Sequence, residues 1–174
     1  MVSAIEIVES YSAYTPTINA RGAVNAVLIT IPSEYLSGLS KIILSDASGL
    51  NRVERRKKTR HRGKTRNRRE AIGKYHPAWQ GEKACITLFV DNIVAQCPTA
   101  IRIQPLRNLV FADVLFHEIG HHIHLTRTKE FREREAVADD WIHRLAERYL
   151  TRRKWYLRPL AKAFKLDEIL RMKL

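Results

Sequence analysis

The sequence has few cysteines and no long apolar segment. Its two cysteines, Cys85 and Cys97, form neither a CxxC pair nor a disulfide framework, which predicts free thiols in a reducing compartment. The N-terminus lacks the basic and then apolar segments of a secretory signal. The longest apolar stretch, near residues 23–31, is too short to cross a bilayer, which takes about 20 residues. We therefore expect a cytoplasmic protein without a membrane partner.

Positive charge dominates the chain but is unevenly placed. The 174 residues are 45% hydrophobic, as expected of one globular domain spanning 1–174, and carry a net charge of +13. Segment 52–69 holds eleven Lys or Arg residues and one Glu, a net +10, and the chain from Arg148 onward holds a net +7. The rest is slightly acidic. The domain is thus predicted to carry a basic insertion at about 51–75 and a basic helical region at about 152–174.

The basic insertion is a candidate for binding polyanions. Clustered positive charge attracts nucleic acid or an acidic partner. Segment 52–69 has no aromatic residue for base stacking, so contacts to nucleic acid would be mainly to phosphates. A solvated loop without a partner is the alternative. The candidate residues are Arg55, Arg56, Lys57, Lys58, Arg60, Arg62, Lys64, Arg66, Arg68 and Arg69.

Hydrophobic periodicity predicts strands first and helices after. Alternating or β-branched runs indicate strands at 3–9, 23–32, 41–46 and 84–94. Helical spacing indicates helices at 106–125 and 130–153. A short helix capped by Ser33 is expected at 33–39, and a helical region interrupted at Pro159 at 155–172. This order is typical of an α+β fold. We expect a small, mainly antiparallel sheet with helices packed on one side.

The stretch HEIGHHIH (117–124) holds four of the seven histidines. His117 and His121 lie one helical turn apart on one face, so their imidazoles can converge on one metal ion. Glu118 lies about 100° round the helix, where it can reach a water bound to that metal without binding the metal itself. This spacing predicts two ligands and a general base.

The other two histidines of the stretch have no predicted role in the metal site. His124 lies about 10 Å along the helix axis from His117, which is too far for both to bind one ion. His122 lies on the flank of the helix. Both are expected to meet solvent, although they could line a cleft.

A third ligand is predicted on the next helix. Glu135 and Asp139 are four residues apart and share a face, so Glu135 can bind the metal while Asp139 accepts a hydrogen bond from the other ring nitrogen of His117. Glu133 lies about 200° from Glu135, so the two cannot both face the metal. Solvated acids on an amphipathic helix are the alternative.

Small residues are placed where the two helices would meet. Gly120 permits close approach of another element over the metal-binding face. Ala136 and Ala138 on the following helix would allow that approach.

These motifs resemble those of the zincin metallopeptidases, in particular the gluzincin branch. HEIGH (117–121) followed by EAVAD (135–139) is similar to the HExxH…ExxAD pattern of the HtpX-type peptidases, whose transmembrane helices this sequence lacks. EREA (133–136) is similar to the ExEA element of the ImmA/IrrE-like peptidases, which keeps Glu133 as an alternative ligand. The metzincin pattern needs Gly and His where this chain has His124 and Arg127.

The resemblance implies a zincin-like fold and a zinc metalloendopeptidase acting on a protein or peptide. One Zn2+ per chain would be held by His117, His121 and Glu135, with Glu118 as the base acting on a water whose pKa zinc lowers to about 7. The resemblance also implies that residues 86–93 form the edge strand beside which a peptide binds. The alternative is a nucleic-acid-binding protein with a structural or inactive zinc site. The basic tract could also cover the cleft.

Overall fold

The computed structural model of the chain describes residues 5–49, 58–61, 64–67, 71–128 and 135–150. The helix expected at 155–172 lies outside these residues. In chain order the elements are β1 (Glu6–Ser10), α1 (Ala20–Leu28), the 3-10 turn η1 (Ser33–Tyr35), β2 (Leu39–Ser45), the 3-10 turn η2 (Ala47–Gly49), β3 (Lys58–His61), β4 (Lys64–Asn67), β5 (Gly73–His76), β6 (Ala84–Phe89), α3 (Val90–Gln96), the 3-10 turn η4 (Ala100–Arg102), α4 (Gln104–Arg127) and α5 (Glu135–Arg148).

The fold is α+β, as predicted, but its four-stranded sheet is mixed and not mainly antiparallel. The strand order is β1-β2-β6-β5; β1, β2 and β6 are parallel to one another, and β5 is antiparallel to β6. The error follows from segment 23–32, predicted as a strand, which begins inside helix α1. Because α1 connects β1 to β2 as a crossover, the two strands run in the same direction.

Helix α1 forms because its apolar residues recur at helical spacing, although Val24 and Val27 are β-branched. The side chain of Asn19 caps the helix by accepting the Gly22 N–H at 2.6 Å. Ile29 follows the helix and is 71% exposed. The buried face consists of Ala20, Ala23, Val24, Val27 and Leu28.

Strand β5 is one edge of the sheet, and a tight turn places it there. Gln80 and Gly81 have positive φ angles of 48° and 88°, as the two central residues of a two-residue hairpin turn require. On either side, Trp79 and Glu82 exchange backbone hydrogen bonds of 3.1 and 2.9 Å. The expectation that residues 86–93 form the edge is therefore wrong, because β6 lies inside the sheet. The basic insertion also ends before β5, whose residues pair with β6.

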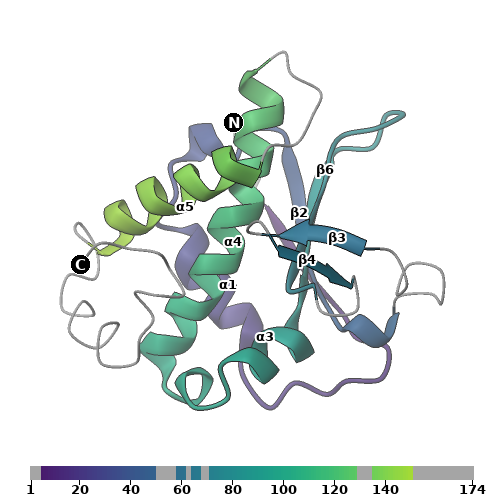
Figure 1. The fold of residues 1–174 in the computed structure, drawn as a ribbon, viewed down its shortest axis with the longest axis vertical. Coiled ribbons are helices and arrows are strands. Elements are labelled where there is room, and N and C mark those ends of the chain that lie inside the picture. Colours follow the sequence, from purple (N-terminus) through teal and green to yellow (C-terminus); the bar gives the residue numbers. More distant parts are fainter. Residues whose placement is uncertain (1–4, 50–57, 62–63, 68–70, 129–134, 151–174) are drawn as a thin grey trace.

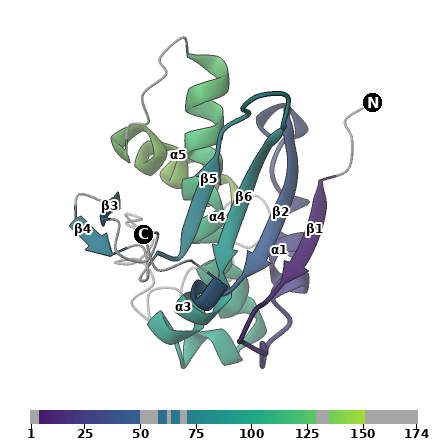
Figure 2. The ribbon, with the colours of Figure 1, turned by 90° about the vertical axis from the view of Figure 1, so that its right-hand side faces the viewer.

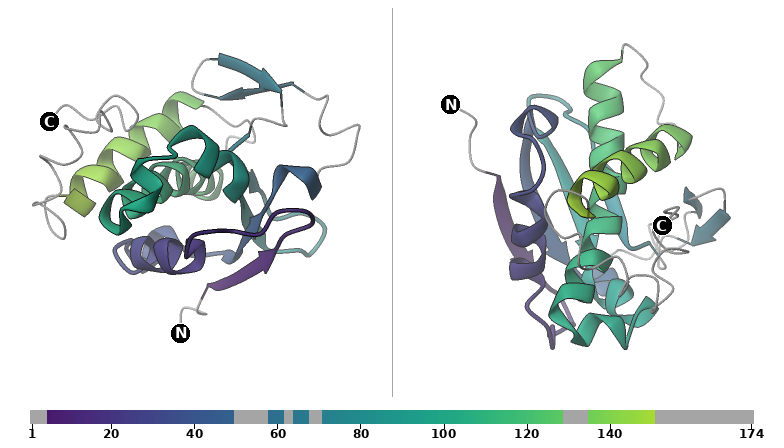
Figure 3. Two further views of the ribbon diagram at one scale, coloured as in Figure 1. Left: turned by 90° about the horizontal axis from the view of Figure 1, so that it is seen from below. Right: turned by 90° about the vertical axis from the view of Figure 1, so that its left-hand side faces the viewer.

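The helices lie on one side of the sheet, as predicted (Figures 1 and 2). A row of paired residues crosses the sheet and is buried under α1 and α4: Ile7, Ile42, Ile86 and Tyr75. Helix α5 lies on the far side of α4 from α1 (Figure 3). Helix α4 is thus covered from several directions, and every residue from Leu109 to His124 is buried.

Helices α4 and α5 pack closely against each other at Gly120. A Cβ placed on Gly120 would lie 2.8 Å from the Ala138 Cα and 2.9 Å from the Ala138 carbonyl oxygen. Ala138 is fully buried, whereas Ala136 is exposed, so the expected role of Ala136 in this packing is wrong. Tyr35 stacks edge-on against Trp141 of α5 with ring centroids 5.1 Å apart. These contacts hold α5 against the C-terminal half of α4 and against the turn η1.

Part of the basic tract forms an antiparallel hairpin of its own. Strands β3 and β4 pair from Lys58 opposite Asn67 to His61 opposite Lys64, and they are not part of the four-stranded sheet. Four of the candidate polyanion-binding residues occupy these strands: Lys58, Arg60, Lys64 and Arg66. The other six, Arg55, Arg56, Lys57, Arg62, Arg68 and Arg69, lie outside the described residues. None of the described helices combines the length and apolarity needed to cross a membrane.

Replacing Gly120 by Ala should force α4 and α5 apart, because the clashing atoms of Ala138 belong to the backbone and cannot rotate away. We expect the free energy of unfolding to fall by about 1–3 kcal/mol, even though alanine favours a helix more than glycine does. Metal affinity should fall with it, since α5 carries Glu135. Chemical denaturation and zinc titration measure the two effects. Wild-type values for both would show that this contact does not set the helix separation.

Candidate metal centre

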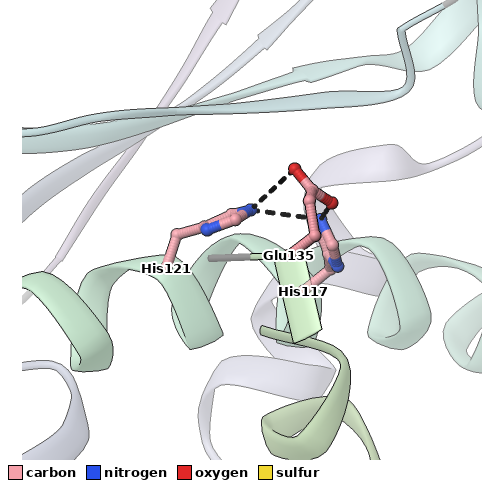
Figure 4. A group of neighbouring side chains, drawn as sticks. All are labelled: His117, His121 and Glu135. Carbon is pink, nitrogen blue, oxygen red and sulfur yellow. Dashed lines mark hydrogen bonds and ion pairs between the residues drawn. The ribbon is translucent and has the colours of Figure 1, made fainter. Parts of the chain in front are cut away.

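Three side chains from two helices converge on one point (Figure 4). The Nε2 atoms of His117 and His121 are 3.2 Å apart. The carboxylate of Glu135 lies 3.5 Å from the first and 3.8 Å from the second. Ligands of a tetrahedral zinc ion, bound at about 2.0–2.2 Å, lie about 3.3–3.6 Å from one another. The group could therefore hold a metal ion.

The two helices position these ligands in different ways. Helix α4 presents His117 and His121 by its own periodicity, since they are one turn apart. Glu135 is the first residue of α5 and reaches the histidines because α5 packs closely on α4. Glu133, the alternative ligand, lies outside the described residues.

Asp139 lies behind His117. Its Oδ1 is 3.4 Å from the His117 Nδ1, on the opposite side of the ring from Glu135. A carboxylate here favours the tautomer with a proton on Nδ1, which leaves the Nε2 lone pair for a metal. Asp139 is one turn beyond Glu135, so one face of α5 serves both sides of the same imidazole.

The electrostatics of the pair favour a cation between the two rings. Burial lowers the pKa of His117, but the adjacent carboxylates of Asp139 and Glu135 outweigh it and raise that pKa to about 9. Burial and the neighbouring His117 lower the pKa of His121. One positive charge is thus stabilised beside the carboxylates and a second is not. A metal ion would supply that charge in place of the proton.

The site is closed toward α4 and more open toward α5. The side chains of His117 and His121 are 1% and 6% exposed, whereas those of Glu135 and Asp139 are 30% and 17% exposed. Solvent therefore reaches the two carboxylates more than the two imidazoles.

His122 and His124 are buried, so the expectation that they meet solvent is wrong. They are 1% and 4% exposed. His122 lies between Tyr75 of β5 and the Ser37 carbonyl oxygen, 3.1 Å and 2.9 Å from its ring nitrogens. The His124 Nδ1 lies 3.3 Å from the Thr128 hydroxyl. His124 is not part of the ligand group, as its position along the helix predicts.

Glu118 is 3% exposed and faces strand β5. A Cβ placed on Gly73 would lie 2.5 Å from the Glu118 Oε1, so the carboxylate lies directly over this glycine. The sequence pattern did not identify Gly73 or Tyr75 as site neighbours, because their four-residue strand follows a highly charged tract. The available signal was the four-residue spacing of Glu118 and His122, which places both on the face that meets β5.

Comparisons with protein-family models, with curated proteins and with solved structures found no match for this chain.

Glu135→Ala should lower zinc affinity by at least about 10-fold, because it removes one of three ligands. Glu133→Ala is the matched control: it removes the same charge two residues away and should bind zinc as the wild type does. Zinc content after dialysis and competition with a chelator measure the zinc affinity of both variants. The reverse pattern would transfer the ligand role to Glu133.

Proposed function

We propose that the chain is a zinc-dependent metallopeptidase. The observation that carries the proposal is the convergence of His117, His121 and Glu135 at spacings suited to tetrahedral zinc, with Glu118 adjoining the first ligand on α4. Three protein ligands leave a fourth position for water or substrate, as in catalytic zinc sites. A structural site would instead be closed by a fourth protein ligand. Among the described residues no fourth ligand joins the group.

The residues around the centre have separate roles in this proposal. Bound zinc would supply a Lewis acid and acidify its water. Glu118, which is buried but not one of the ligands, would take the proton from that water and deliver it to the leaving amine. Asp139 would hold His117 in the metal-binding tautomer.

Glu118→Gln should abolish cleavage but leave zinc bound, because the amide keeps the shape of the side chain and cannot accept the proton. The rate should fall by about 10²–10⁴-fold. Quenched peptides of mixed, neutral sequence measure cleavage, and elemental analysis measures zinc. His117→Ala is the control that should lose both. If the wild type binds zinc but cleaves none of these peptides, the result would support the metal site and contradict the peptidase function.

We also propose a polyanion partner for the basic hairpin. The specific observation is that β3 and β4 form a separate ribbon outside the four-stranded sheet, with four Lys or Arg residues in eight positions. A two-stranded ribbon fits the major groove of DNA, and its cations would neutralise phosphates.

Replacing Lys58, Arg60, Lys64 and Arg66 together by threonine, which favours strands, should weaken binding to a DNA duplex of random sequence. The slope of log affinity against log salt should flatten by up to about 3–4. Replacing Lys162, Lys165, Arg171 and Lys173 removes the same charge and is the matched control; it should have the smaller effect. Wild-type binding that is insensitive to salt, or selective for polyglutamate over DNA, would contradict a nucleic-acid partner.

A further inference from the structure

Strand β5 and helix α4 are in contact at two points. The distance between these two points is about the same along the strand as along the helix. Gly73 and Tyr75 are two residues apart in β5 and therefore point to the same side, about 7 Å apart along the strand. Glu118 and His122 are four residues apart in α4, or about 6 Å along the helix. Gly73 lies against Glu118, and Tyr75 contacts His122. The strand is thus aligned with the part of the helix that holds the predicted base.

The first point depends on the absence of a side chain at residue 73. A Cβ there would lie 2.5 Å from the Glu118 Oε1 and 3.0 Å from both its Cδ and Cγ. These separations are shorter than van der Waals contact between carbon and carbon or oxygen. Any larger residue would displace the Glu118 carboxylate from its present position. Gly73 itself has an ordinary backbone conformation, because its φ is not among the positive values. Residue 73 must therefore be glycine because a side chain has no room there, and not because of its backbone conformation.

The second point is a hydrogen-bonded chain through a buried histidine. The His122 Nε2 is 2.9 Å from the Ser37 carbonyl oxygen, which can only accept, so Nε2 donates. With that proton on Nε2, the Nδ1 of the neutral imidazole is an acceptor. The Tyr75 hydroxyl, 3.1 Å away, therefore donates to Nδ1. The two rings also meet edge to face, with centroids 5.6 Å apart. This chain connects β5 to α4 and to the turn before β2.

We infer that Gly73, Tyr75 and His122 are positioning residues, which fix edge strand β5 along α4 and keep the Glu118 carboxylate in place over Gly73. The inference rests on the proposed peptidase function. Gly73 would act on the chemical step through Glu118. The Tyr75–His122 contact would act on substrate binding, because an extended peptide that pairs with β5 is held only as firmly as the strand itself.

Gly73→Ala tests the first role. We expect kcat to fall by about 10–100-fold with KM and zinc content unchanged, since small displacements of a catalytic group have effects of this size. The melting temperature should fall by at least about 2 °C. In the Glu118→Gln background, Gly73→Ala should lower the melting temperature by the same amount. In the Glu118→Ala background, Gly73→Ala should leave the melting temperature unchanged, because the clashing atoms are absent.

The melting comparison requires no enzymatic activity, so it stands even if the wild type cleaves no peptide. A Gly73→Ala variant that melts alike in all three backgrounds would overturn the contact with Glu118. Wild-type kcat in an active Gly73→Ala enzyme would overturn the positioning role.

Tyr75→Phe tests the second role, because it removes the donor and keeps the ring. KM should rise by about 3–10-fold, the range expected for one hydrogen bond, while kcat and zinc content stay unchanged. Tyr14→Phe, near the opposite edge of the sheet, is the control. His122→Asn retains an acceptor near the Nδ1 position and should recover part of the affinity that His122→Leu loses.

Amide hydrogen exchange gives a readout without substrate. In Tyr75→Phe, exchange should accelerate in β5 and not in β1. Faster exchange throughout the sheet, or an equal effect on kcat and KM, would show that Tyr75 contributes to general stability and does not position the strand.

Discussion

The backbone contact between Gly120 and Ala138 is the constraint from which the geometry of the metal centre follows. Helix α4 brings its two histidines together by its own periodicity, but the carboxylates belong to α5 and reach the rings only if the helix axes are close. With no Cβ at Gly120, the Ala138 backbone can approach to van der Waals distance. The edge-on packing of Tyr35 on Trp141 adds to this attachment. A buried histidine pair would otherwise lack the acids that stabilise a cation.

The same helix is in contact with both parts of the proposed site. One side of α4 carries His117 and His121 toward α5, and another carries Glu118 and His122 toward strand β5. Burial of so many polar groups in a central helix costs free energy unless each group has a partner. The acids of α5, the Tyr75 hydroxyl and the Ser37 carbonyl oxygen are such partners. The polar residues of α4 therefore connect the layers of the fold.

The misassigned segment 23–32 shows how one local error changes the topology. Its β-branched residues favour a strand, yet Ala20, Ala23, Val24, Val27 and Leu28 bury a helical stripe against the core. As a helix, this segment supplies the crossover that the parallel pairing of β1 and β2 requires. The chain then reaches β6 and β5 through the basic tract and a tight turn. Within the four-stranded sheet, edge strand β5 is the strand that the sequence pattern did not identify, since four residues beside a charged tract carry little periodicity.

The sequence by itself determined what depends on local geometry: the α+β composition, the long helix α4, the pairing of His117 with His121, and the one-turn spacing of Glu135 and Asp139. These follow from the fixed pitch of a helix. Tertiary structure decided the rest: the parallel strands, the buried state of His122 and His124, and the meeting of Gly73 with Glu118. Each of these joins residues far apart in the chain. Their contact depends on how apolar faces pack together, and hydrophobic burial is non-directional, so periodicity alone does not specify the partner.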